Sequence, residues 1–339
     1  MNQTILIDTA KKLVAPGKGI LAADESSKTI QKRFDKIGLT STPETNLAYR
    51  SMLFTTSGIE QYISGVILYE ETIRQSIEGK SVPQYLESKG ILPGIKVDKG
   101  AWRLPNFERE KVTEGLDELR DRLTEYKNLG AKFAKWRAVI AIGEGIPTEA
   151  AILANAHALA RYAALCQEQD IVPIVEPEVL MDGGHDPARC QEVTEQTLKI
   201  VFEQLKLYKV LLEGMLLKPN MVISGKEAAT QALAEEIAQA TVETFKKVVP
   251  FEVPGIVFLS GGQTPDQATE NLAAINKIGG PWQLSYSYGR ALQEEALNTW
   301  ACFTDSARRV GKEENIKTAQ QAFLDRAQKV SAARSINPS

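Results

Sequence analysis

The sequence predicts an α/β fold in which eight parallel strands and their helices close into one barrel. Three observations lead to this prediction. Short apolar runs that end in polar residues recur eight times, helix-patterned segments separate most of them, and the runs extend from about residue 19 to residue 289. Strands that alternate with helices form parallel sheets, and eight such units over roughly 250 residues are typical of the (β/α)8, or TIM, barrel.

The predicted strands follow one another along the chain without an internal repeat or an interdomain linker. They are 19–25, 65–71, 94–99, 133–140, 172–179, 214–220, 255–262 and 283–289. We therefore expect residues 1–339 to form a single domain. Its barrel strands occupy about 19–289, and a C-terminal helix and short tail occupy 290–339.

Helix signals agree with this arrangement. Thr42 before Pro43 predicts a helix start, because threonine caps helices and proline suits the first helical position. The segment 148–168 carries apolar residues at helical spacing, and we expect that stripe to face the barrel. The segment 313–333 is amphipathic and predicts a further helix, followed by a frayed end over 335–339.

Composition excludes several classes of function. The net charge of −3 gives no reason to expect nucleic acid or a membrane as a partner, so an acidic substrate needs a local cationic pocket. Three separated cysteines and the lack of a basic, apolar leader favour a cytoplasmic location. Only two histidines are present, and neither has the spacing of a zinc site. We expect no metal and no cofactor, and acid–base chemistry then falls to carboxylates, lysines or tyrosines.

Ionisable or hydroxyl side chains end nearly every predicted strand. They are Asp24, Glu70, Lys96 with Asp98, Lys135 with Arg137, Glu176 with Glu178, Lys218, Ser260 and Ser287. Reactive groups of parallel barrels gather where strands end and loops begin. Residues two apart on a strand face the same way, so Lys135 and Arg137 share a face, as do Glu176 and Glu178. Each residue alone is equally consistent with a solvated strand end, but the set on one rim predicts a site.

Lys218 is the candidate nucleophile. It ends an apolar strand and precedes Pro219, which keeps its predecessor extended. Burial and a nearby cation, for which Lys135 is the candidate, both disfavour the ammonium form of a lysine. A free amine condenses with a ketone to form an imine, and the protonated imine stabilises a carbanion on the adjacent carbon. The alternative is a structural lysine paired with a carboxylate.

Carboxylates on two other strands are candidates for proton transfer. Imine chemistry needs a group that removes and returns protons, and either Glu176 or Glu178 can serve while the other pairs with a lysine. Asp24 ends the first strand and can orient or deprotonate a substrate hydroxyl. A structural ion pair is the alternative for the two glutamates.

Two places suggest phosphate binding. The loops after the seventh and eighth strands are the recurrent phosphate site of these barrels, and glycine amides and an arginine suit an anion. These loops contain Ser260, Gly261, Gly262, Ser287, Gly289 and Arg290. A second cluster after the first strand contains Ser26, Ser27, Thr29, Lys32 and Arg33. A solvated helix start explains that second cluster equally well.

The histidines and tryptophans are interpreted as structural. His157 lies in an alanine-rich segment, and His185 lies in a turn-rich loop after the glutamate pair. The tryptophans, interpreted as packing residues, are Trp102, Trp136, Trp282 and Trp300.

Seven motifs resemble those of class I, Schiff-base fructose-bisphosphate aldolases. They are GKGILAADES, GIKVDKG, FAKWR, IVPIVEPE, LLKPNM, FLSGGQ and SYGRAL, and the resemblance runs from about residue 17 to residue 330. Several such motifs in this order are highly specific. The resemblance implies a metal-independent TIM-barrel lyase of glycolysis, gluconeogenesis or the Calvin cycle, and the family's usual assembly is a homotetramer.

The resemblance also implies a role for each matching residue. Lys218 matches the imine-forming lysine, Glu176 the proton acceptor and donor, and Glu178 the glutamate beside the lysine. Asp24 and Lys135 match residues that assist carbinolamine turnover and bond cleavage. The residues that match one phosphate site are Ser260, Gly261, Ser287, Gly289 and Arg290, and those around the other end of the substrate are Ser26, Arg33, Lys96 and Arg137.

The end of the chain departs from the family's pattern. Animal and plant members end in a flexible tail whose final tyrosine helps to move a proton. This chain ends in INPS and has no tyrosine beyond Tyr288. The hypothesis is that another acid or water performs that step.

The sequence therefore predicts reversible cleavage of fructose 1,6-bisphosphate to dihydroxyacetone phosphate and glyceraldehyde 3-phosphate. Sedoheptulose 1,7-bisphosphate carries the same ketone and phosphates and stays open as a substrate. Two other interpretations also stay open. A phosphosugar isomerase on the same barrel needs a carboxylate base and a phosphate site but no reactive lysine, and a scaffold role needs no chemistry at all.

Overall fold

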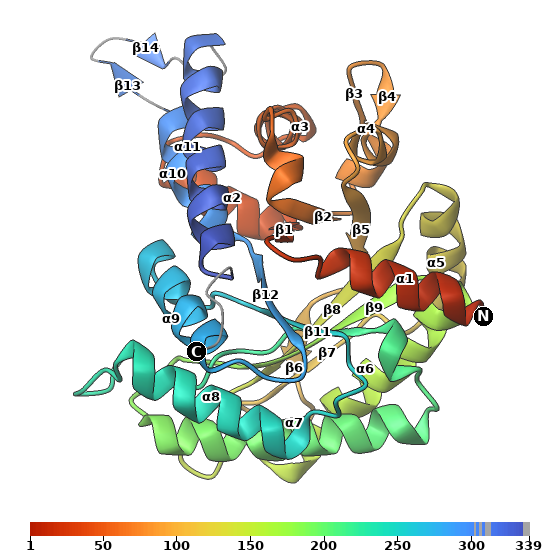
Figure 1. The fold of residues 1–339 in the computed structure, drawn as a ribbon, viewed down its shortest axis with the longest axis vertical. Helices are drawn as coiled ribbons and strands as arrows, with labels where there is room; N and C mark the ends of the chain where they lie inside the picture. Colours follow the sequence, from red (N-terminus) through yellow and green to blue (C-terminus); the bar gives the residue numbers. More distant parts are fainter. Residues whose placement is uncertain (302, 305–306, 309–312, 335–339) are drawn as a thin grey trace.

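A closed barrel of eight parallel strands forms the centre of the molecule (Figure 1). The computed structural model describes residues 1–301, 303–304, 307–308 and 313–334. The barrel strands are β1 (Gly19–Ala23), β2 (Ile63–Leu68), β5 (Leu92–Lys96), β8 (Phe133–Ile140), β9 (Val172–Val179), β10 (Leu216–Leu217), β11 (Gly255–Phe258) and β12 (Gln283–Tyr288). Each strand pairs with the next along the chain, and β12 returns to pair with β1. The predicted TIM barrel is confirmed, and each predicted run overlaps one of these strands.

The strand sequences explain why the sheet is parallel and closed. All eight residues of β9 are buried, and in β8 only Arg137 is exposed. Strands that are buried on both faces read as nearly continuous apolar runs, because helices cover one face and the barrel interior the other. The buried polar residues within these strands therefore point into the barrel rather than into bulk solvent.

Helices follow the strands and cover the outside of the barrel (Figure 1). They are α2 (Ser27–Asp35), α3 (Pro43–Phe54), α4 (Val82–Ser88), α5 (Leu119–Asn128), α6 (Glu149–Glu168), α7 (Pro187–Leu207), α8 (Ala234–Val248), α9 (Pro265–Ile278) and α10 (Arg290–Trp300). Short 3-10 turns lie at η1 (Ile59–Gln61), η2 (Thr72–Arg74) and η3 (Leu212–Gly214). The predicted start of α3 is confirmed, since the Thr42 side chain accepts a hydrogen bond from the Thr45 amide at 3.2 Å.

The predicted outer helices bury their apolar stripes. In α6 the stripe from Ile152 to Cys166 is buried, as predicted. The further helix α11 (Glu313–Ala332) buries Phe323, Ala327 and Val330 and contacts α10 and α3. The predicted frayed end, 335–339, lies outside the described residues. Among the described helices, none is long and apolar enough to span a membrane.

One helix, α1 (Gln3–Leu13), closes the N-terminal end of the barrel. Its Leu6 and Leu13 belong to one buried cluster with Phe133 and Val257 of the barrel strands. Sequence analysis assigned no element to this segment. The opposite end of the barrel, where the strands finish, is thereby left as the open end.

Several short elements were also not predicted. They are the hairpins β3 (Ser76–Ile77) with β4 (Lys80–Ser81), β6 (Ala101–Arg103) with β7 (Lys111–Thr113), and β13 (Phe303–Thr304) with β14 (Ala307–Arg308). The predicted run 214–220 forms only the two-residue strand β10. Pro219 has no N–H group for a sheet hydrogen bond, so regular pairing ends beside Lys218.

Candidate active site

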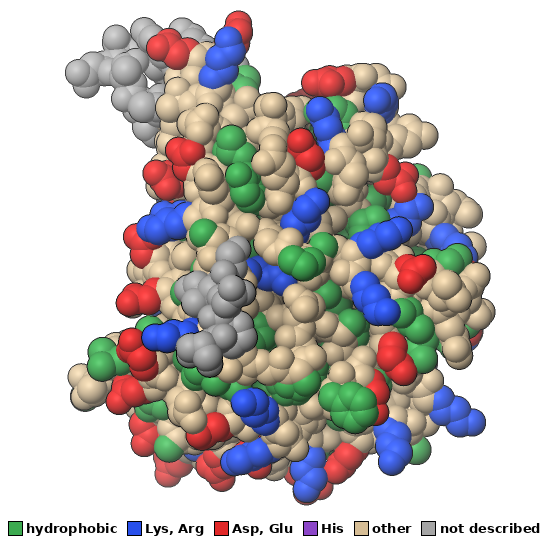
Figure 2. Space-filling view, viewed as in Figure 1, with side chains coloured by type: hydrophobic (Ala, Val, Ile, Leu, Met, Phe, Trp, Pro, Cys, Tyr) green, Lys and Arg blue, Asp and Glu red, His purple; other side chains and the backbone are tan. Residues whose placement is uncertain are grey.

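The carboxyl ends of the strands surround a cavity of about 630 Å³. All fifteen site residues predicted from the sequence line it: Asp24, Ser26, Arg33, Lys96, Lys135, Arg137, Glu176, Glu178, Lys218, Ser260, Gly261, Gly262, Ser287, Gly289 and Arg290. Nine of the lining residues are Lys or Arg and five are Asp or Glu. The whole chain carries a net charge of −3, so the positive excess belongs to the cavity rather than to the whole molecule, and on the face drawn in Figure 2 the two signs are interspersed.

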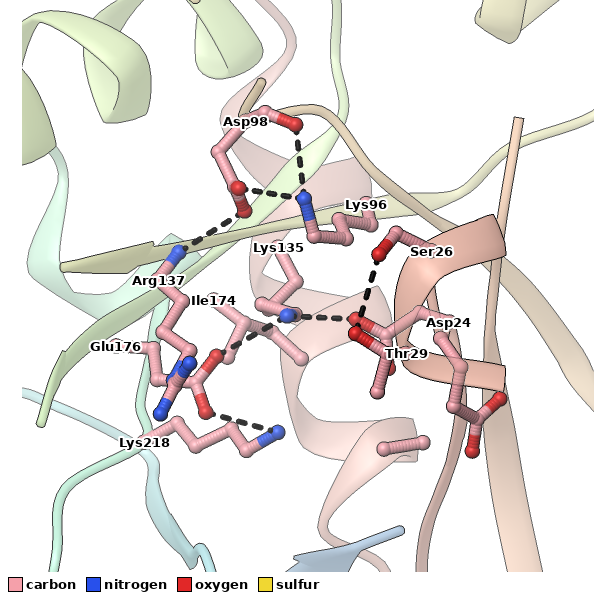
Figure 3. A network of polar contacts seen from close by, with 12 residues as sticks. Asp24, Ser26, Thr29, Lys96, Asp98, Lys135, Arg137, Ile174, Glu176 and Lys218 are labelled. Carbon is pink, nitrogen blue, oxygen red and sulfur yellow. Dashed lines mark hydrogen bonds and ion pairs between the residues drawn. The ribbon is translucent and has the colours of Figure 1, made fainter. Parts of the chain in front are cut away.

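Lys218 lies directly after β10 with its side chain only 4% exposed. Its backbone amide donates to the Val175 carbonyl at 2.8 Å, which keeps the residue in register with β9. Its Nζ atom lies 3.2 Å from Glu176 Oε1 (Figure 3). The amine is therefore buried and in contact with a carboxylate that can exchange protons with it.

Lys135 lies between two carboxylates in the same cluster. Its Nζ atom is 2.6 Å from Asp24 Oδ2 and 3.3 Å from Glu176 Oε2 (Figure 3). Burial alone lowers the pKa of Lys135, but the charges of Asp24 and Glu176 outweigh it and raise that pKa above its usual 10.5. Burial alone raises the pKa of Asp24, but the ammonium groups of Lys135 and Lys218 outweigh it and lower that pKa below its usual 3.8. Asp24 and Lys135 therefore form a charged pair beside Lys218.

A second pair of strands supplies further charged groups. Arg137 on β8 pairs through Nε with Glu178 on β9. Lys96 at the end of β5 pairs with Asp98, whose other carboxylate oxygen accepts from the Arg137 amide at 3.3 Å (Figure 3). Lys96 and Arg137 both line the cavity and each is held by a neighbouring carboxylate, so a substrate anion can compete for them.

The loop after β11 contains a backbone position that only glycine fits well. Gly262 has a φ of +71°, and a Cβ atom added there would lie 1.6 Å from Met181 Sδ. Ser287 Oγ is buried and makes no hydrogen bond within the described part of the chain. Buried hydroxyls normally have a partner, which favours Ser287 as a donor to a bound oxyanion.

The family model described as "Glycolytic: Fructose-bisphosphate aldolase class-I" matches residues 5–337. The chain belongs to the class I fructose-bisphosphate aldolase family.

Individual relatives agree with the family match. A protein of Xanthomonas campestris named as a probable fructose-bisphosphate aldolase class 1 is 57% identical over 87% of this chain and 89% of its own length. The cytosolic fructose-bisphosphate aldolase 4 of Arabidopsis thaliana is 50% identical over 97% of this chain and 82% of its own length. A solved structure of the Plasmodium falciparum enzyme, in complex with TRAP and a small-molecule inhibitor, has a TM-score of 0.94. The sequence of that structure is 47% identical to this chain, and the match covers 99% of this chain and 95% of the Plasmodium falciparum chain.

Some residues singled out from the sequence lie outside the aldolase cavity. Glu70 and Asp98 do not line it, and Glu70 instead pairs with Lys99 at 3.1 Å. His185 is also outside the lining, whereas His157 Nδ1 lies 3.3 Å from the Tyr208 hydroxyl, in agreement with its structural interpretation.

The interpretation of the tryptophans as packing residues is wrong in one case. Trp102 on β6 is 55% exposed, whereas Trp136, Trp282 and Trp300 are buried.

Within the described residues, no group of three or more His, Cys, Asp or Glu side chains is arranged to hold a metal.

Sequence reasoning missed a buried network behind the cavity wall. Arg33 pairs with Glu25 at 2.5 Å, and Glu25 in turn lies 3.7 Å from the fully buried Arg50. Arg50 donates to the Thr72 hydroxyl at 2.7 Å. Glu25 follows Asp24 in the chain and was available as a signal, but Arg50 lies within α3 and carries no local mark of a site.

Further lining residues were also missed, among them two from the loops after β9 and β10. Met181 and Lys226 come from the loops after β9 and β10 and reach the cavity only because those loops fold over it. Neither follows its strand directly, so the rule that placed reactive groups at strand ends did not select them.

Proposed function

We propose that this enzyme cleaves fructose 1,6-bisphosphate reversibly to dihydroxyacetone phosphate and glyceraldehyde 3-phosphate through an imine on Lys218. The observation that carries the proposal is the contact of Glu176 with both Lys218 and Lys135 in a buried, cationic cavity. The relatives named above carry the same activity in their names.

The first half of the reaction forms the imine. Lys218 loses a proton to a neighbouring base, for which Glu176 at 3.2 Å is the nearest candidate, and the neutral amine attacks the ketone carbon. The resulting carbinolamine loses its hydroxyl group as water when a proton is supplied. The Lys135 ammonium, held by Asp24 at 2.6 Å, is placed to assist this step.

The second half breaks the carbon–carbon bond. A base removes the proton of the substrate's C4 hydroxyl, the C3–C4 bond breaks, and its electron pair moves into the protonated imine to give an enamine. The aldehyde then leaves, a proton returns to C3, and water hydrolyses the new imine to release the second product. Glu176 is the proposed proton acceptor and donor, while Asp24 and Lys135 assist bond cleavage.

The two phosphates are assigned to two groups of residues. Loops after β11 and β12 offer glycine amides, the Ser287 hydroxyl and Arg290 for one of them. The residues proposed for the other end of the substrate are Ser26, Arg33, Lys96 and Arg137. Binding at both ends holds the ketone against Lys218, and correct positioning of this kind contributes a large share of catalytic rate.

The test of the proposal is covalent trapping. Borohydride added with fructose 1,6-bisphosphate is expected to reduce the imine and leave the mass of the ketose phosphate on the peptide that contains Lys218. Lys218→Ala is expected to abolish both turnover and trapping, because no other group forms the imine. Peptide mapping by mass spectrometry separates Lys218 from the other cavity lysines, which are Lys32, Lys36, Lys96, Lys135 and Lys226.

Two results would contradict the proposal. Full activity in Lys218→Ala is one, and an adduct found only on another lysine is the other. A chelator is the control and is expected to leave turnover intact. An isomerase on the same barrel would interconvert a sugar phosphate without any trapped adduct.

The cellular location and the assembly are part of the same proposal. A cytoplasmic location is supported by the relative of Arabidopsis thaliana whose name includes the word cytosolic. A homotetramer is supported by the family resemblance alone.

A further inference from the structure

The loops after β9 and β10 are joined to each other at the mouth of the cavity. Three backbone hydrogen bonds of 2.8 to 3.0 Å run from the amides of residues 225–227 to carbonyls within residues 181–185. They fix the loops as one rim. From this rim the side chains of Met181 and Lys226 line the cavity.

The side chain of Lys226 lies against the loop after β11. A Cβ atom added to Gly262 would lie 2.8 Å from Lys226 Cε. The stem of Lys226 therefore lies directly against Gly262, and its ammonium group is one bond further on. This places a positive charge beside the backbone that is proposed to hold a phosphate.

The ammonium group of Lys226 is held only weakly. Among the described residues its one ion pair is with Asp182 Oδ1 at 3.1 Å, and the two side chains are 49% and 67% exposed. Solvent screens an exposed pair of this kind, so it contributes little. A phosphate group carries more negative charge than Asp182 and presents three acceptor oxygens, so it can take over the ammonium.

We propose that Lys226 is a specificity-determining residue for phosphorylated ketoses. Its ammonium exchanges Asp182 for the phosphate bound by the loops after β11 and β12, and it thereby favours phosphorylated substrates over unphosphorylated ones. The inference rests on the proposed function, because the phosphate concerned belongs to the substrate of that reaction.

The test compares variants that separate charge from packing. Lys226→Met keeps the stem and removes the charge, and it is expected to raise the KM for fructose 1,6-bisphosphate about fivefold with kcat unchanged, the effect of one partly exposed charged contact. The dissociation constant for inorganic phosphate, measured by direct titration, is expected to rise by a similar factor. Lys226→Arg keeps the charge and is expected to retain wild-type values.

The chain offers a matched control. Lys247 pairs with Glu195 at 3.1 Å with side chains 57% and 38% exposed, and it does not line the cavity. Lys247→Met removes the same charge from a similar environment and is expected to change neither KM nor phosphate binding. An equal rise in both Met variants would reflect net charge alone and would overturn the inference.

The remaining outcomes distinguish the inference from the proposed function. Wild-type KM and phosphate binding in Lys226→Met would overturn the role of Lys226 and leave the aldolase proposal standing. An equal loss in Lys226→Arg and Lys226→Met would indicate packing rather than charge and would also overturn it. A wild-type enzyme that fails to cleave fructose 1,6-bisphosphate would contradict the proposed function, and the phosphate titration would still decide about Lys226.

Discussion

Glu176 shares its two carboxylate oxygens between two amines. Oε1 lies 3.2 Å from Lys218 Nζ, and Oε2 lies 3.3 Å from Lys135 Nζ. None of the three side chains is more than 5% exposed, so solvent and salt screen these charges little. The arrangement suits a reaction in which Lys218 gives up a proton before it attacks while Lys135 keeps its own.

The charged state of Asp24 leads to a prediction about pH. The pKa of Asp24 lies below its usual 3.8, so its ionised form stabilises the folded state. That stabilisation is fully present above about pH 4 and is lost as the pH falls towards the depressed pKa. Asp24→Asn is expected to lose about 3 kcal/mol of stability at pH 7, because it removes one partner of a buried pair.

The measurement is urea unfolding of wild type and Asp24→Asn at a series of pH values. The difference in the free energy of unfolding is expected to shrink by about 1.4 kcal/mol for each pH unit below about pH 4. A difference that stays constant from pH 7 to pH 3 would show that the pKa of Asp24 is not depressed.

Residues at strand ends were predictable from the sequence because the barrel topology alone brings them together. Asp24 and Lys218 are far apart in the chain, yet both follow parallel strands and so meet in one cavity. Lys226 and Arg50 were not predictable in this way. The first depends on how a loop folds back over the cavity, and the second depends on how α3 docks behind it. Neither is encoded in a local pattern.

At the scale of elements, the loop after β11 depends on one left-handed residue. Gly262→Ala places a Cβ atom at a φ of +71° and against Met181 and Lys226. The left-handed conformation costs about 1–2 kcal/mol for a residue with a Cβ atom. We also expect the KM for fructose 1,6-bisphosphate to rise by at least about tenfold, because a small displacement of binding groups is costly.

The control for this prediction is Gly79→Ala. Gly79 has a φ of +77°, and nothing lies within 4 Å of an added Cβ atom. Gly79→Ala should lose the stability that the left-handed conformation costs, and Gly262→Ala should lose at least as much in urea unfolding, but only Gly262→Ala should raise the KM in steady-state assays. An unchanged KM in Gly262→Ala would show that this loop does not contact the substrate.

Long periodic elements were predicted well, and short ones were missed. The runs that became β8, β9 and α6 are eight or more residues long, and burial imposes a clear pattern on them. The strands of the hairpins β3–β4 and β6–β7 are two or three residues long. Such strands carry too few residues to show a period, and their pairing depends on the turn between them. Helix α1 has apolar residues at helical spacing but precedes the first strand, so the strand–helix alternation did not draw it into the prediction.

At the scale of the whole molecule, helix α1 and the last described residues of the chain are tied to the end of the barrel opposite the cavity. Helix α1 packs into the N-terminal end of the barrel. The end of α11 and the residues just after it reach the same place, where Ser331 Oγ donates to the Gly17 carbonyl and Arg334 donates to several carbonyls around β1 and β12. These two segments thus stabilise the barrel from the end that takes no part in the proposed chemistry.

Arg334 provides the test of this separation between stability and catalysis. Its guanidinium donates to the carbonyls of Ala15 at 2.8 Å, Leu284 at 3.0 Å and Val14 at 3.2 Å. Arg334→Ala leaves these partly buried carbonyls without their charged donor and is expected to cost about 3 kcal/mol in urea unfolding, with kcat and KM unchanged. Arg120→Ala is the control, because its pair with Glu168 is exposed and should contribute little. If Arg334→Ala lowered kcat at temperatures where it stays folded, the two ends of the barrel would be coupled and this separation would be wrong.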